Sequence, residues 1–141
     1  MIKSFLRIPT NSWNTDLGLL FLRIVAGLYL ALIHGWSKIP PGQFTGMIQG
    51  MGLPGIVAWV VAFTELFGGL LIALGFLTRP ASLVLVIQFL VVVLVAHAPD
   101  PVSQRELGLL YLTVSSLLLL AGPGRFSVDG ILNRKSSPYQ R

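Results

Sequence analysis

Two charged side chains, Arg23 and Glu65, stand inside long apolar runs of this 141-residue sequence. A charge near the centre of a bilayer costs at least about 2.5 kcal/mol, so each needs a partner or a task if these runs cross a membrane. One interpretation is a structural ion pair that locks two helices together. The other is a substrate or proton site at mid-membrane, and the residues alone leave both open.

The expected depths of the two charges allow them to meet. In antiparallel helices Arg23 would lie about 11 Å and Glu65 about 18 Å from the same end, at 1.5 Å per residue. A long arginine side chain can bridge that offset. We therefore expect Glu65 to contact Arg23 or another buried donor, because an unpartnered carboxylate at this depth would instead be protonated.

A second group of polar residues falls at the opposite end of the proposed helices. His34 and His97 end two apolar runs, Glu106 begins another, and Lys38 follows in the adjoining loop. Two imidazoles with a carboxylate and an ammonium suit anion binding or proton transfer. Ordinary polar residues also gather at span ends, which is the plainer interpretation. The candidate substrate-binding residues are His34, Lys38, Glu65, His97 and Glu106.

The sequence offers little machinery for intrinsic redox chemistry. It contains no cysteine, and no glycine-rich phosphate loop or haem motif is present. His34, His97 and Glu106 are ligand types for a metal, but no close spacing supports a metal site, and we expect none. We also expect no intrinsic cofactor and assign no catalytic residue, so electrons would have to come from elsewhere.

The elements that must position these residues are transmembrane helices. The chain is 54% hydrophobic and only 11% charged, with a mean hydropathy of +0.80, whereas soluble domains carry about 25% charged residues. Four runs suit spanning helices, at about 16–34, 54–77, 80–97 and 105–121. The valine-rich third run resembles a strand, but an isolated strand would leave backbone groups unpaired in lipid. We predict a single all-α domain over 1–141, a transmembrane four-helix bundle.

Small residues follow both buried charges at intervals of four. Gly27, Ala31 and Gly35 follow Arg23, and Gly69 and Ala73 follow Glu65. This spacing predicts close packing of the first two helices. Gln88 in the third run is expected to form a hydrogen bond between helices.

The net charge of +5 reflects topology and headgroup contacts rather than nucleic-acid binding. With four spans, one side of the membrane holds seven basic residues and the other holds two, Lys38 and Arg105. The positive-inside rule then places both termini in the cytoplasm of a multi-pass protein of the cell membrane. The seven are Lys3, Arg7, Arg79, Arg125, Arg134, Lys135 and Arg141.

Several short motifs resemble the DoxX family, in order and over about residues 16–132. They are Leu22-Arg23 with Gly27, the run from His34 to Lys38, Glu65-Leu66-Phe67-Gly68-Gly69, Gly75 with Thr78-Arg79, and the run from Gly122 to Asp129. The resemblance implies a four-helix protein of the bacterial cytoplasmic membrane. Members resemble subunits of quinone-linked oxidoreductases, including thiosulfate:quinone oxidoreductase, and of complexes that handle oxidative stress. Wider relatives resemble chaperones and cargo receptors, so membership alone does not settle the chemistry.

Two functions follow as hypotheses. The first is a membrane subunit of an oxidoreductase complex that binds a quinone or small redox substrate between its helices. The second is a non-catalytic scaffold or chaperone that binds a partner's transmembrane helix through glycine-lined faces. A transporter is a weaker third, because four helices leave little room for a gated path unless the protein dimerises. The expected partners are the bilayer, an oxidoreductase subunit and further copies of the chain.

Overall fold

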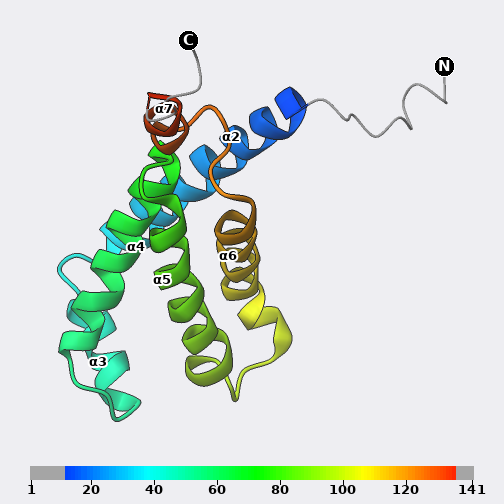
Figure 1. Ribbon diagram of the computed structural model, residues 1–141. Coiled ribbons are helices and arrows are strands. Elements are labelled where there is room, and N and C mark those ends of the chain that lie inside the picture. The colour runs from blue at the N-terminus through cyan, green and yellow to red at the C-terminus, as the bar shows by residue number, and fades with distance from the viewer. Residues whose placement is uncertain (1–11, 136–141) are drawn as a thin grey trace.

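The computed structural model describes residues 12–135. All the regular secondary structure in this part of the chain is helical. Helix α2 (Ser12–Leu28) continues through a π-helical segment, η1 (Tyr29–Gly35), and a 3-10 turn, η2 (Trp36–Lys38). Short α3 (Gly42–Gly50) precedes α4 (Ile56–Leu74). Helix α5 (Thr78–Val91) runs on into π-helical η3 (Val92–Ala96), and α6 (Val102–Ala121) and α7 (Val128–Lys135) complete the order (Figure 1). The valine-rich run is therefore helix, as lipid requires.

Three helices are long and apolar enough to cross a membrane, namely Trp13–Lys38, Ile56–Leu74 and Thr78–Ala96. They cover the first three predicted spans. The fourth predicted span, 105–121, lies in α6, which has 20 residues but is not among the three. Its first turns carry Gln104, Arg105 and Glu106, which lower its mean hydropathy. The prediction of an all-α membrane bundle is confirmed, with α6 the most polar of its four long helices.

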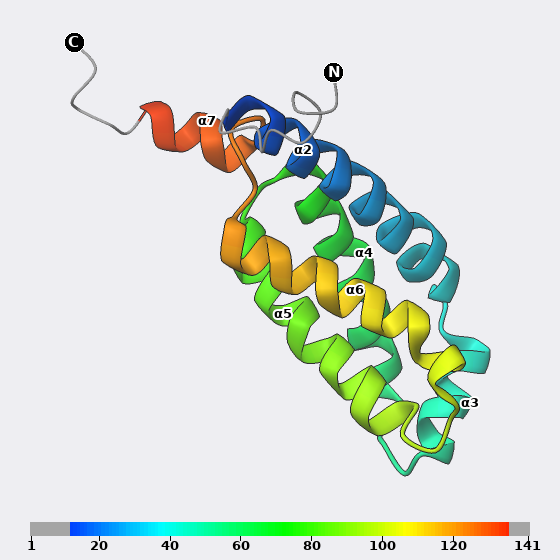
Figure 2. The ribbon, with the colours of Figure 1, turned by 90° about the vertical axis from the view of Figure 1, so that its right-hand side faces the viewer.

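The long helices pack in chain order. Helix α2 with η1 packs along α4, α4 along α5, and α5 along α6, while α2 and α6 make few contacts with each other (Figure 2). Leu30, Leu85, Phe89 and Leu118 belong to the buried core between them. The bundle is thus least closed between its first and last long helices.

Glycines allow α2 and α4 to come into backbone contact. A Cβ atom added to Gly27 would lie 2.6 Å from the carbonyl oxygen of Gly69, and one added to Gly69 would lie 2.6 Å from that of Gly27. At Gly35, an added Cβ would lie 2.6 Å from the Cα of Leu66. The close helix packing predicted from the small residues is confirmed.

The segment after α6 returns to the end of the bundle where α2 begins (Figure 1). The backbone N–H of Arg125 donates to Oδ1 of Asp16 (2.9 Å), and the backbone N–H of Asp129 donates to the carbonyl of Gly75 (2.9 Å). Residues 12 and 135 therefore belong to one end of the bundle, which we call the α7 end. The side of the membrane that it faces stays a prediction, and Lys3, Arg7 and Arg141 lie outside the described residues.

Candidate functional site

Glu65 lies near the middle of α4 and is only 3% exposed. Its carboxylate is bound from two other elements. Gln88 of α5 donates through Nε2 to Oε1 (3.1 Å), and Lys38 of η2 donates through Nζ to Oε2 and forms an ion pair there. The carboxylate therefore holds α4, α5 and η2 together, and the predicted interhelical bond of Gln88 is confirmed.

Arg23 is not the partner of Glu65, so the Arg23–Glu65 ion pair is wrong. The guanidinium, 1% exposed, donates through Nη1 to the carbonyl of Ala73 (3.1 Å) and through Nη2 to that of Phe126. Ala73 lies about two turns beyond Glu65, in the last turn of α4, where carbonyls lack intrahelical partners and the helix dipole favours a cation. The arginine extends toward that helix end instead of toward mid-membrane. The alternative expectation, that another donor meets Glu65, holds for Lys38, although this donor is only partly buried.

Lys38 reaches Glu65 because the end of the first long helix stays close to α4. Gly35 places its backbone against Leu66, the neighbour of Glu65, and η2 brings Lys38 over the carboxylate three residues later. The ammonium also lies 5.0 Å from the centre of the Phe44 ring, a cation–π distance. The Lys38 side chain is 23% exposed, so the ion pair is accessible from outside the protein on the lysine side.

Two polar rings, one from η1 and one from α6, are in contact with each other. The His34 ring lies 5.5 Å from the ring of Tyr111 in an edge-on arrangement, and Tyr111 stacks on Phe89 at 5.3 Å. Both His34 and Tyr111 lie within electrostatic range of Glu65. Among residues 12–135, neither the imidazole nitrogens of His34 nor the hydroxyl of Tyr111 takes part in a hydrogen bond. We call Glu65, Lys38, Gln88, His34 and Tyr111 the Glu65 cluster.

Tyr111 was not among the predicted site residues. The signal that places it is its register on α6, where Tyr111, Ser115 and Leu118 recur at helical spacing and are all buried. Such spacing identifies the inward face of a helix, but not which other helix that face meets. The contact with His34 joins α6 to η1 and could not be derived from α6 alone.

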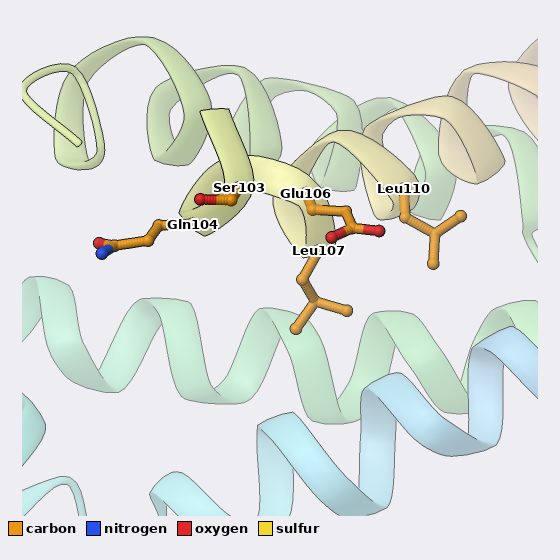
Figure 3. Close-up of a pocket in the computed structure, with 5 residues that line it drawn as sticks. All are labelled: Ser103, Gln104, Glu106, Leu107 and Leu110. Carbon is orange, nitrogen blue, oxygen red and sulfur yellow. The ribbon is translucent and has the colours of Figure 1, made fainter. Parts of the chain in front are cut away.

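His97 and Glu106 lie in other surroundings. His97 contacts Asp100 through Nδ1 and Oδ2 (2.6 Å), next to a loop in which Arg105 donates to the Asp100 carbonyl through Nε (3.0 Å). Glu106 is exposed and lines a shallow pocket of about 270 Å³, whose lining side chains all come from α6 (Figure 3). No hydrogen bond or ion pair joins any two of His34, His97 and Glu106, all of which the structure describes. Of the predicted site residues, Lys38 and Glu65 are in contact, and His34 lies within electrostatic range of both.

The sequence profile of the DoxX family matches residues 18–98, which include His34, Lys38, Glu65 and Gln88. The chain belongs to the DoxX family. It is 34% identical over 125 residues to the inner membrane protein YqjF of Escherichia coli, covering 85% of this chain and 95% of that protein. It is 29% identical over 116 residues to a Bacillus subtilis protein named "Putative oxidoreductase CatD", covering 81% and 86%. No solved structure gives a significant match.

The short DoxX motifs separate into two places in the fold. Arg23, Gly75 and Asp129 meet at the α7 end, although they are far apart in sequence. Lys38 and Glu65 form an ion pair deeper in the bundle, and His34 lies within electrostatic range of both. The first set is joined mainly through backbone carbonyls and amides, and the second through titratable side chains.

Proposed function

We propose that this DoxX-family protein is the membrane subunit of an oxidoreductase complex and binds the polar head of a small redox substrate, a quinone, at the Glu65 cluster. The supporting observation is the pair His34 and Tyr111. Both rings have hydrogen-bonding groups that no described residue uses, and both lie within electrostatic range of the buried carboxylate of Glu65. A site of this kind orients an apolar ligand through a few polar groups.

The chemistry of the cluster suits a quinone. Each carbonyl oxygen of a quinone accepts hydrogen bonds, which an imidazole N–H and a phenol O–H can donate. Reduction to a quinol takes up two electrons and two protons. In this proposal the Lys38–Glu65 pair, partly exposed on the lysine side, would pass protons to a bound oxygen. The electrons would come from a partner subunit or from a second bound substrate.

The α6 pocket suits the apolar part of such a ligand. Leu107 and Leu110 line it, and Leu107 lies one turn before Tyr111 on α6. Glu106 contributes a carboxylate to the same pocket and enters the proposal as a polar group at its edge. His97 is engaged with Asp100 and is not part of the proposed site. The name of the Bacillus subtilis relative supports oxidoreductase chemistry as its general class.

The scaffold hypothesis has less support. It required glycine-lined faces that accept a partner's helix. The faces that carry Gly27 and Gly69 are occupied by each other, and that of Gly35 by Leu66. A foreign helix would have to displace α2 from α4 to use them.

Quinone extraction from purified protein tests the proposal. We expect the unchanged chain to carry quinone from bacterial membranes, measured by mass spectrometry per mole of protein. Loss of one hydrogen bond in His34→Leu or Tyr111→Phe should lower retention about two- to tenfold. His97→Leu is the matched control, because this histidine has its own partner, and it should retain the quinone.

Two results would contradict the proposal. One is an unchanged chain that carries no quinone and gains none when quinone is added in detergent. The other is equal loss of quinone in His34→Leu and His97→Leu. Purification with a stoichiometric protein and no small ligand would instead favour the scaffold.

A further inference from the structure

A cavity of about 530 Å³ opens at the α7 end of the bundle, away from the Glu65 cluster. It lies among the ends of α4 and α6, the start of α5, and α7. Its lining includes one guanidinium, that of Arg79, and the exposed apolar side chains of Phe76, Leu77 and Leu132. The cavity therefore combines a positive charge with an apolar wall.

Arg79 differs from the arginines Arg23 and Arg125 at the α7 end in having no polar partner among the described residues. Arg23 donates to two carbonyls, and Arg125 lies 4.0 Å from Asp16 and 5.7 Å from the Trp13 ring. Within residues 12–135, Arg79 has no hydrogen bond or ion pair and is exposed. Its guanidinium nevertheless packs against the α6–α7 connection, because a Cβ added to Gly122 would lie 3.7 Å from the Nε atom of Arg79. An unpaired cation rests against the turn that ends α6.

The acidic residue in the cavity forms no ion pair with Arg79. Asp129 accepts hydrogen bonds from the backbone N–H groups of Leu77 and Thr78, both at 2.9 Å, one on each carboxylate oxygen. Its charge is directed to the first turn of α5, where it caps that helix. The cavity therefore offers a free cation and an engaged anion.

The position of the cavity in the fold indicates which anion it meets. Phe76 and Leu77 lie in the connection between α4 and α5, two of the helices that can span a membrane. Such a connection lies where helices leave the hydrocarbon, at the depth of lipid phosphates. Basic pockets between helix ends at this depth recognise anionic headgroups.

We propose that this cavity is a binding site for an anionic phospholipid. Arg79 would bind the headgroup phosphate, and Phe76, Leu77 and Leu132 would contact the part of the acyl chains nearest the headgroup. The apolar wall distinguishes a lipid from free phosphate, which has nothing to place there. A zwitterionic lipid carries a compensating cation, and among the described residues that line the cavity its only carboxylate, Asp129, already accepts two backbone hydrogen bonds. The site does not depend on the function of the Glu65 cluster.

Native mass spectrometry of the full chain in detergent tests the site. Phosphatidylglycerol and phosphatidylcholine with the same acyl chains are added, and the lipid retained by each variant is compared. One basic group at a membrane surface corresponds to about a fivefold change in binding, so Arg79→Gln should lower retention of phosphatidylglycerol by about that factor. Arg125→Gln removes the same charge at the same end outside the cavity and should retain the lipid.

A second variant tests the cavity rather than the charge. Ala121 is exposed and lines the cavity, so Ala121→Phe should reduce retention by filling it while the net charge is unchanged. Equal retention of the two lipids, or equal loss in Arg79→Gln and Arg125→Gln, would overturn the proposal. So would displacement of the lipid by sodium phosphate but not by sodium chloride of the same ionic strength, because the site would then take free phosphate.

Discussion

The two charges buried in the bundle, Arg23 and Glu65, are held by different kinds of partner. The guanidinium of Arg23 binds backbone carbonyls of Ala73 and Phe126, which do not titrate and are fixed in the fold. The carboxylate of Glu65 binds the side chains of Lys38 and Gln88, and one of these can exchange a proton and is partly exposed. A charge fixed by backbone acceptors is suited to holding structure, whereas a charge among titratable side chains is suited to chemistry.

The surroundings of the two charges differ in the same sense. Beside Arg23, Gly75 has a positive φ of 67° and leaves no room for a side chain, because an added Cβ would lie 2.5 Å from the Cβ of Ser127 and closer still to the guanidinium. Within electrostatic range of Glu65, two polar rings retain unused hydrogen-bonding groups. We infer that changes at the α7 end act on stability first, and changes in the Glu65 cluster on ligand binding first.

The largest effect is expected at Gly75. Gly75→Ala should lower the free energy of unfolding by about 3 kcal/mol, because alanine is strained at this φ and its methyl group would collide with Arg23 and Ser127. Thermal unfolding in detergent measures it. Gly18→Ala is the control, because Gly18 has open space around it and alanine should leave stability unchanged or raise it. Equal stability of the two variants would remove the steric argument.

The coupling between Lys38 and Glu65 should be the next largest. A double-mutant cycle with Lys38→Met and Glu65→Gln should give an interaction energy of about 2 kcal/mol, because the two side chains form a largely buried ion pair. Quinone retention should fall in both single variants. Additive losses of stability would mean that the pair contributes no net interaction.

A smaller loss is expected when the cap of α5 is removed. Asp129→Ala should cost about 1 kcal/mol, because the N–H groups of Leu77 and Thr78 lose their acceptor. Trypsin should then cut the α7 region faster, while quinone retention stays unchanged. Asn133→Ala, on the same helix, serves as the control for cleavage. A fall in quinone retention with unchanged stability would break the division between the two regions.

The smallest coupling is expected for Arg23 and Glu65, the ion pair that was one of the two interpretations of the sequence. Arg23→Leu and Glu65→Gln should be additive within about 0.5 kcal/mol, because the two side chains share no partner. The same unfolding assay measures the coupling between Arg23 and Glu65. A coupling as large as that expected for Lys38 and Glu65 would show that the two regions act as one.

The sequence alone determined the features that depend on composition and local spacing. Lipid forces apolar runs of this length into helices, so the runs containing Arg23, Glu65 and Gln88 could be placed without a structure. Small residues at intervals of four identify one face of a helix, which is why the close packing of the first two helices was predictable. Residue type also identified His34, Lys38 and Glu65 as candidates for chemistry.

Only the tertiary structure decided which of these residues meet. The partner of a buried charge depends on the axial offset and rotation of neighbouring helices. Arg23 meets Ala73, about two helical turns along α4 from the expected partner Glu65. Its second acceptor, Phe126, is 103 residues away, and no local pattern encodes that contact. Tyr111 joins the Glu65 cluster only because α6 meets the end of the first long helix at His34. These contacts are set by packing across the whole bundle, since each helix satisfies its own backbone hydrogen bonds and leaves the choice of neighbour to its side chains.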